Sequence, residues 1–208
     1  MITDAGRGQR ADATRNAGRI LRATREVYAG YGPDAPLEEI ARRAGVGIAT
    51  LYRHFPNKAD LVRAALEQSI AEKISPAIEQ ALEDDDPRRG LTVLLEAALS
   101  MVADEHATLA AARNSGALTA SVAAPFRESL TVLTRRAQQA GAIRADIVPD
   151  DMPRIVTMLI GVLWTMPPRS DGWQGYLTLI LDGLSPAGAS ALPPAVPLST
   201  TEQGSFPI

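Results

Sequence analysis

The sequence predicts an all-α protein with a three-helix head and a larger helical body. Apolar residues recur at spacings of three and four along most of the 208 residues, as they do on one face of an α-helix. No segment shows the alternation of apolar and polar residues that indicates a half-buried strand. Glycine and proline stand between the periodic segments, where they end one helix or begin the next.

Residues 37–58, LEEIARRAGVGIATLYRHFPNK, predict two short helices joined by a tight turn. Gly45 stands where the end of a helix favours a positive φ, which glycine adopts without steric cost. Val46 follows as a buried plug, and Leu51 and Phe55 form an i, i+4 apolar pair on the second helix. Small residues let the two helices cross closely, and the first helix has three apolar residues on one face: Ile40, Ala41 and Ala44. This is the plan of a helix-turn-helix.

The outer face of the second helix is polar and suits nucleic acid. Its side chains can reach phosphate oxygens and base edges, and they are Thr50, Tyr52, Arg53 and His54. The first 60 residues contain ten Lys or Arg against seven Asp or Glu, whereas the remainder contains eleven against seventeen. A basic N-terminal third on an acidic body is expected if only one end of the protein meets nucleic acid.

The N-terminal third resembles the DNA-binding domain of the tetracycline-repressor-type (TetR) family of bacterial transcriptional regulators. The resemblance rests on an ordered set of residues: Ile20, Leu21, Tyr31, Gly32, Ile40, Ala44, Gly45, Val46, Thr50, Leu51, Tyr52, His54, Phe55, Lys58 and Leu61. It implies two sets of DNA contacts. Phosphates would be held by Thr50, Tyr52, His54 and Lys58. Gly47, Ile48, Ala49 and Arg53 would lie at or near base edges.

The helical pattern and the resemblance together predict four segments. Residues 1–14 form a flexible arm, residues 15–60 the DNA-binding helix-turn-helix domain, residues 61–184 an effector-binding and dimerisation domain, and residues 185–208 a disordered tail. The first helix is expected from Asn16, with an apolar stripe that reaches Tyr31. Its opposite face carries arginines that are either solvated or in contact with phosphates: Arg15, Arg19, Arg22 and, slightly rotated, Arg25.

The body is expected to be a set of helices, two of which suggest an interface. The long helix after Asn57 either ends or kinks at Pro76, and the resemblance makes it the lever between head and body. The last two helices are apolar nearly all round, so they either lie inside the body or face a second subunit. The resemblance favours the second alternative, because TetR-type proteins form homodimers through these helices.

The resemblance also implies a small-molecule effector that binds in the body. Candidate lining residues are Met101, His106, Arg113, Asn114, Phe126, Met158 and Trp164. Ordinary core packing explains each apolar member as well, and a solvated helix face explains Arg113 and Asn114 equally well.

Several other classes of protein are disfavoured by composition. With two histidines and no cysteine, a catalytic triad, a metal cluster or thiol chemistry has little to work with, and no phosphate-binding or dinucleotide motif occurs. The sequence therefore predicts no enzyme, no cofactor and no metal site. The first residues lack the apolar core of a signal peptide. The apolar run at residues 155–166 is shorter than the roughly 20 residues that span a bilayer, so a cytoplasmic protein is expected.

The function expected from these observations is ligand-responsive transcriptional regulation. The protein would bind a palindromic double-stranded DNA operator as a homodimer, repress transcription, and release the operator when a small molecule binds its body. The alternative keeps the fold and the DNA binding but has no effector: a nucleoid-associated or division-linked DNA-binding protein.

Overall fold

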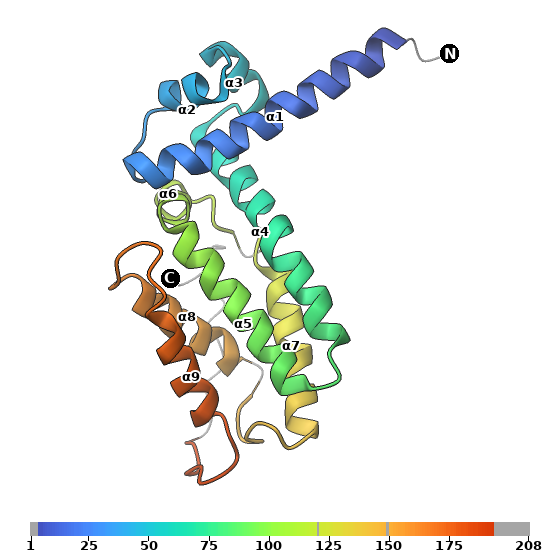
Figure 1. Ribbon diagram of the computed structural model, residues 1–208, viewed down its shortest axis with the longest axis vertical. Helices are drawn as coiled ribbons and strands as arrows, with labels where there is room; N and C mark the ends of the chain where they lie inside the picture. The colour runs from blue at the N-terminus through green and yellow to red at the C-terminus, as the bar shows by residue number, and fades with distance from the viewer. Residues whose placement is uncertain (1–3, 120, 149, 194–208) are drawn as a thin grey trace. The chain divides into compact units, whose positions relative to one another are not determined.

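The computed structural model describes residues 4–119, 121–148 and 150–193, and these residues form helices and no β-strand (Figure 1). The predicted all-α fold is confirmed. In chain order the helices are α1 (Asp4–Tyr31), α2 (Leu37–Ala44), α3 (Ile48–His54), α4 (Lys58–Glu83), α5 (Pro87–Asp104), α6 (His106–Ser115), α7 (Ala124–Gln139), α8 (Asp151–Leu163) and α9 (Trp173–Gly183).

The helices divide into two compact units. The first, which we call the head unit, consists of Met1–Gln68 and Glu105–Leu118. The second, the body unit, consists of Ser69–Asp104 and Thr119–Ile208. One boundary falls inside α4, and the whole of α6 belongs to the head unit. The domain boundaries expected from the sequence stay a prediction, but the assignment of α6 to the head unit was not anticipated by them.

Helix α1 begins earlier than the sequence predicts. It starts at Asp4 rather than near Asn16, so the expected flexible arm is helical from residue 4 onward, while residues 1–3 lie outside the described residues. The segment has no apolar stripe, but once a helix exists each further residue adds a hydrogen bond at little cost. Local polar pairs support the exposed part: Arg15 contacts Asp12, and Arg19 donates to the side chain of Asn16 at 2.5 Å. In Figure 1 this part of α1 extends beyond α2 and α3.

The head core forms where α1, α2, α3 and the start of α4 meet. Its large members are fully buried: Ile20, Tyr28, Ile40, Leu51 and Leu61. Two expected core positions differ from the prediction. Tyr31 is 65 % exposed because α1 ends there, beyond the residues that cover Tyr28, and Val46 is only half-buried because it lies in the turn rather than on a helix face.

The turn between α2 and α3 depends on a glycine. Gly45 has φ +66°, and the amide of the next residue, Val46, donates to Ala41 O at 3.0 Å, which closes the end of α2. Gly47 has the ordinary φ of −71° and caps α3, where its carbonyl accepts from the amides of Thr50 and Leu51. The predicted helix-turn-helix is therefore present in the backbone.

The body unit is built around α5, which contacts α7, α8 and α9. Its core is rich in leucine, and the fully buried members are Leu91, Leu94, Leu95, Leu99, Leu130 and Leu133. Helix α4 continues through Pro76 to Glu83 rather than ending there. Pro76 is exposed, whereas Ile74, Ala77 and Ala81 are buried, so packing of the apolar face holds the helix together where one backbone hydrogen bond is lost.

The segment after α9 is held at several points, although the sequence predicts disorder from residue 185. The amide of Arg144 donates to Leu184 O at 2.8 Å, its guanidinium contacts Ser190 O, and the amide of Leu192 donates to Asp146 Oδ2 at 3.1 Å. The Arg144 guanidinium, followed by the amide of Leu192, holds the pKa of Asp146 well below its usual value. The remainder of the predicted tail, residues 194–208, lies outside the described residues.

A Gly90→Ala substitution should destabilise the body unit. A Cβ at this position would lie 2.5 Å from Ala81 O and 3.3 Å from Leu133 Cδ2, and the carbonyl belongs to the α4 backbone, which cannot rotate away. We expect a loss of about 1–3 kcal/mol in the free energy of unfolding, measured by denaturant titration. Gly18→Ala in the interior of α1 is the matched control: its nearest neighbour would be 3.8 Å away, so stability should stay equal or rise. Equal stability of the two variants would contradict the close crossing of α4 and α5.

A Gly45→Ala substitution should weaken the head unit for a different reason. No atom lies within 4 Å of the added Cβ, so the cost comes only from the left-handed backbone, about 1–2 kcal/mol of unfolding free energy. Gly47→Ser serves as the control, because Gly47 has an ordinary φ and a serine there gains a capping hydroxyl worth a few tenths of a kcal/mol. Thermal unfolding of both variants would check the prediction, and a neutral Gly45→Ala would refute it.

Candidate nucleic-acid interface

The burial of Leu51 fixes which side of α3 faces outward. Leu51 is fully buried, so the residues on the other sides of this helix are left at the surface. Ile48 is 36 % and Tyr52 46 % exposed, Ala49 and Arg53 are exposed, and Thr50 and His54 are half-buried. The structure thus brings most of the predicted DNA-binding residues together on α3 and its N-cap. Their contacts with DNA stay a prediction.

Lys58 is anchored to the head in a way that the sequence did not indicate. Its ammonium donates to Pro33 O at 3.0 Å and lies 5.7 Å from the centre of the Tyr28 ring. Burial, followed by the charge of Asp34, raises the pKa of Tyr28 to about 12, so the phenol under this cation is neutral at physiological pH. An ammonium has three N–H groups, so Lys58 can keep the Pro33 bond and still donate to a phosphate oxygen.

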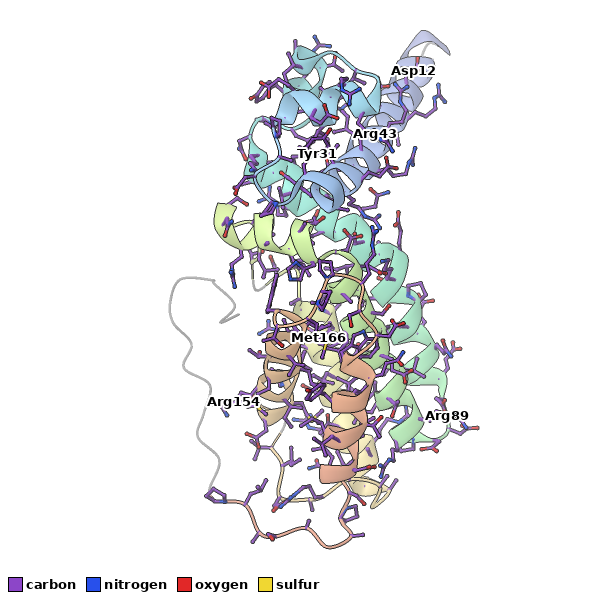
Figure 2. The ribbon with its side chains drawn as sticks, turned by 60° about the vertical axis from the view of Figure 1, so that its left-hand side comes forward. Asp12, Tyr31, Arg43, Arg89, Arg154 and Met166 are labelled. Atoms are coloured by element: carbon purple, nitrogen blue, oxygen red, sulfur yellow. The ribbon has the colours of Figure 1, made fainter. Side chains whose placement is uncertain are left out.

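The arginines of α2 pair with glutamates of the head. Arg42 Nε donates to Glu39 Oε2 at 2.8 Å, and this hydrogen bond is the main reason why the pKa of Glu39 is lowered. Arg43 Nε donates to Glu26 Oε2 of α1 at 2.7 Å, with both side chains more than half exposed. Figure 2 shows Arg43 projecting from α2 on the side of α1. The pairs offset two carboxylates that would otherwise repel DNA phosphates.

Helix α1 adds a second basic surface to the head unit. Arg15, Arg19 and Arg22 are exposed and recur at spacings of four and three, so they follow one face of the helix. The predicted outward arginine stripe is therefore present for these three residues. Arg25 differs, because its side chain is only 18 % exposed and pairs with Glu105 of the head unit. Helical periodicity compares residues on one helix, so it could not predict a pair between Arg25 and a carboxylate 80 residues away.

The seven effector-pocket candidates fall in different parts of the molecule. Met101 is buried in an apolar cluster with Ile74 and Ala98, and Phe126 packs against the same cluster. Met158 is 60 % exposed on α8, and Trp164 is half-buried just after it. The remaining three lie on α6 in the head unit: His106, Arg113 and Asn114. Met101 and Phe126 thus share one cluster, and the role of all seven stays a prediction.

His106 is one of the two histidines of the chain and stands at the start of α6. Burial lowers the pKa of His106, so this histidine is neutral near pH 7. Among the residues that the structure describes, no group of three or more His, Cys, Asp or Glu could hold a metal ion. Within the same ranges, no helix is both long enough and apolar enough to cross a membrane.

Comparison with known proteins matches both parts of the chain. Residues 20–65 match the family described as bacterial regulatory proteins of the tetR family, and residues 86–186 match the C-terminal domain of SbtR-like transcriptional regulators. The HTH-type transcriptional regulator Rv2250c of Mycobacterium tuberculosis is 30 % identical over 156 residues, which cover 72 % of this chain and 78 % of that protein. The HTH-type transcriptional repressor LfrR of Mycolicibacterium smegmatis is 38 % identical over 98 residues, 47 % of this chain and 46 % of that protein.

A solved structure agrees over nearly its whole length. The TetR transcriptional regulator SCO0520 from Streptomyces coelicolor superimposes with a TM-score of 0.60 at 30 % sequence identity, covering 82 % of this chain and 99 % of that one. The same family is indicated by three observations: the head with its glycine turn and outward-facing α3, the helical body, and the match to Rv2250c. The chain therefore belongs to the TetR family of DNA-binding transcriptional regulators.

Proposed function

We propose that this protein is a ligand-responsive repressor, which binds a palindromic operator as a homodimer and releases it when a small molecule binds the body unit. The observation that carries the proposal is the outward face of α3, which is held in place by the burial of Leu51. The similarity to LfrR, which is named a repressor, supports the direction of regulation. The proposal assigns the protein no enzymatic activity.

Sequence readout would come mainly from a few residues of α3. Arg53 is exposed and offers the bidentate donors that recognise guanine in the major groove. Ile48 and Ala49 are exposed at the start of the helix and offer apolar contacts to thymine methyl groups. Thr50, Tyr52, His54 and Lys58 would hold phosphates and so set the register of the head on the duplex. With few base-reading side chains, the shape of the DNA would contribute much of the specificity.

The dimer interface would lie on α8 and α9. Three large apolar side chains remain well exposed on these helices: Met158 at 60 %, Tyr176 at 46 % and Leu179 at 66 %. Gly161 of α8 and Gly175 of α9 have no atom within 4 Å of an added Cβ, so the surface beside them is open to close approach. A second copy would cover this apolar surface and place two recognition helices on successive turns of DNA, about 34–36 Å apart.

The effector would bind at the apolar cluster of the body unit. Ile74 of α4, Met101 of α5 and Phe126 of α7 pack together there, with Ile70 and Ile78 partly buried beside them. Apolar side chains of this kind would favour a mostly apolar small molecule. Binding would stabilise one arrangement of these helices over another, and α4, which runs from the head unit into the body unit, would carry the change.

Selection of the operator from random DNA with the full-length protein is the most direct test of the proposed function.

The two cationic contacts should behave differently when removed. Arg53→Ala should lose about 1–3 kcal/mol of operator binding and relax specificity at one base pair. Lys58→Ala should weaken binding to all sequences alike and reduce the salt slope by about one unit, because it removes a phosphate contact. Gel-shift titrations at several salt concentrations would measure both. Unchanged operator affinity for both variants would exclude this assignment of α3.

A charge placed on α9 should separate the subunits. Leu179→Glu would bury a carboxylate in the proposed interface, so we expect a monomer by sedimentation and an operator affinity lower by roughly a hundred-fold or more. Val132→Glu on α7 is the matched control, because Val132 is 47 % exposed but lies outside the proposed interface. A Leu179→Glu protein that remains dimeric would place the interface elsewhere.

A further inference from the structure

We propose that Glu105 is a positioning residue through which the body unit controls operator affinity, an inference that rests on the repressor function proposed above. Glu105 pairs with Arg25 of α1 and directly precedes α6, whereas the proposed DNA contacts lie on α3 and at Lys58. It would act through Arg25 of α1, its partner in an ion pair. Both residues of the pair belong to the head unit.

The carboxylate of Glu105 is buried and held on both oxygens. Its side chain is 6 % exposed, and Oε1 accepts from Arg25 Nε at 2.7 Å. Oε2 accepts from the hydroxyl of Thr108, which is 1 % exposed, at 3.1 Å. A pair with this much burial is screened little by solvent, and removing one partner leaves the other charge poorly compensated. The contact therefore fixes the start of α6 on α1 far more firmly than an exposed pair would.

The position of Glu105 in the chain gives this contact its proposed role. Glu105 is the single residue between α5 and α6, and the chain passes from the body unit to the head unit at the Asp104–Glu105 bond. Asp104 Oδ2 accepts from Lys73 Nζ of α4 at 2.8 Å inside the body unit. This neighbouring pair is partly exposed, at 31 % for Lys73 and 46 % for Asp104, so it holds α5 to α4 only weakly. Because Glu105 follows Asp104 directly in the chain, a movement at the end of α5 reaches Glu105 through one peptide bond.

The path from the end of α5 through Glu105 to Arg25 joins two regions with proposed functions, the effector cluster and the DNA-binding surface. Met101 lies one turn before the end of α5 and belongs to the apolar cluster proposed to take the effector. On the other side, Tyr28 follows Arg25 by three residues on α1, and Lys58 lies over its ring. Arg25 and Tyr28 therefore connect Glu105 to Lys58, the residue that begins α4 beside the recognition helix. This route is distinct from a lever action of α4 itself.

The first test compares two single-atom changes at neighbouring positions in the full-length protein. Glu105→Gln keeps the shape of the side chain and its bond to Thr108 but removes the charge that pairs with Arg25. We expect operator affinity to fall by about ten-fold with an unchanged salt slope, because no phosphate contact is lost. Asp104→Asn is the control; its side chain is 46 % exposed, and operator affinity should change less than two-fold, as estimated for a screened surface pair.

Hydrogen exchange in the free protein tests the contact without any DNA. Glu105→Gln should lower the protection of amides in α6 and around Arg25 by about ten-fold, and Asp104→Asn should not. If Glu105→Gln fails to fold, Thr108→Val replaces it, since it removes the second hydrogen bond and leaves the ion pair. Unchanged protection would overturn the proposal. A wild-type protein that binds no selected operator would instead overturn the repressor function, while the exchange result would still stand or fall on its own.

Transmission from the body is tested by a double-mutant cycle with Met101→Ala. This change should alter protection around Arg25 by about five-fold in the wild-type background and by less than two-fold when Glu105→Gln is also present. Two outcomes would refute the inference. One is no response of α1 to Met101→Ala, and the other is an equal response in both backgrounds, which would mean that the signal bypasses Glu105.

Discussion

The left-handed turn at Gly45 is the constraint on which the DNA-binding surface depends. A φ of +66° at Gly45 lets α2 stop and the chain turn so that Leu51 of α3 is buried, as Ile40 of α2 is. Once Leu51 is buried, helical geometry alone decides that Arg53 and Tyr52 point outward. The side chains proposed to read base edges therefore lie on one helix and its N-cap. Their orientation is set by buried residues such as Leu51, which face the core.

This dependence explains why the head could be predicted from the sequence. The head is specified by local features: a positive-φ glycine, small residues on one helix face and an apolar pair four residues apart. Each restricts the backbone conformation independently of the rest of the chain. The positions of Gly45 and Leu51 in the structure are those that the pattern requires. In the body, periodicity predicted the helices, because a buried leucine stripe needs only its own helix to be recognised.

Contacts between distant residues could not be predicted in this way. Arg25 differs from Arg19 and Arg22 in the sequence pattern only by a slight rotation about the helix, yet it pairs with Glu105, 80 positions away. The helical start of α1 was missed because the prediction relied on an apolar stripe. A helical segment that packs against no core does not need such a stripe. The effector candidates fall in both units for a related reason, because residue type and position on a helix say little about which helix faces meet.

The charges of the head follow from the same division between local and distant contacts. Arg42 and Arg43 lie in the last turn of the helix that precedes the recognition helix, but both are paired with glutamates, Glu39 and Glu26. The cations proposed to attract DNA are Arg53 on α3, the exposed Arg19 and Arg22 of α1, and Lys58, which keeps N–H groups beyond its bond to Pro33 O. In the proposed function, general attraction to the duplex and discrimination between sequences would be carried largely by different helices. Because α1 also holds Arg25, the helix that supplies the general attraction is the one to which Glu105 is tied. A change at Glu105 would therefore reach operator affinity before it reached sequence preference.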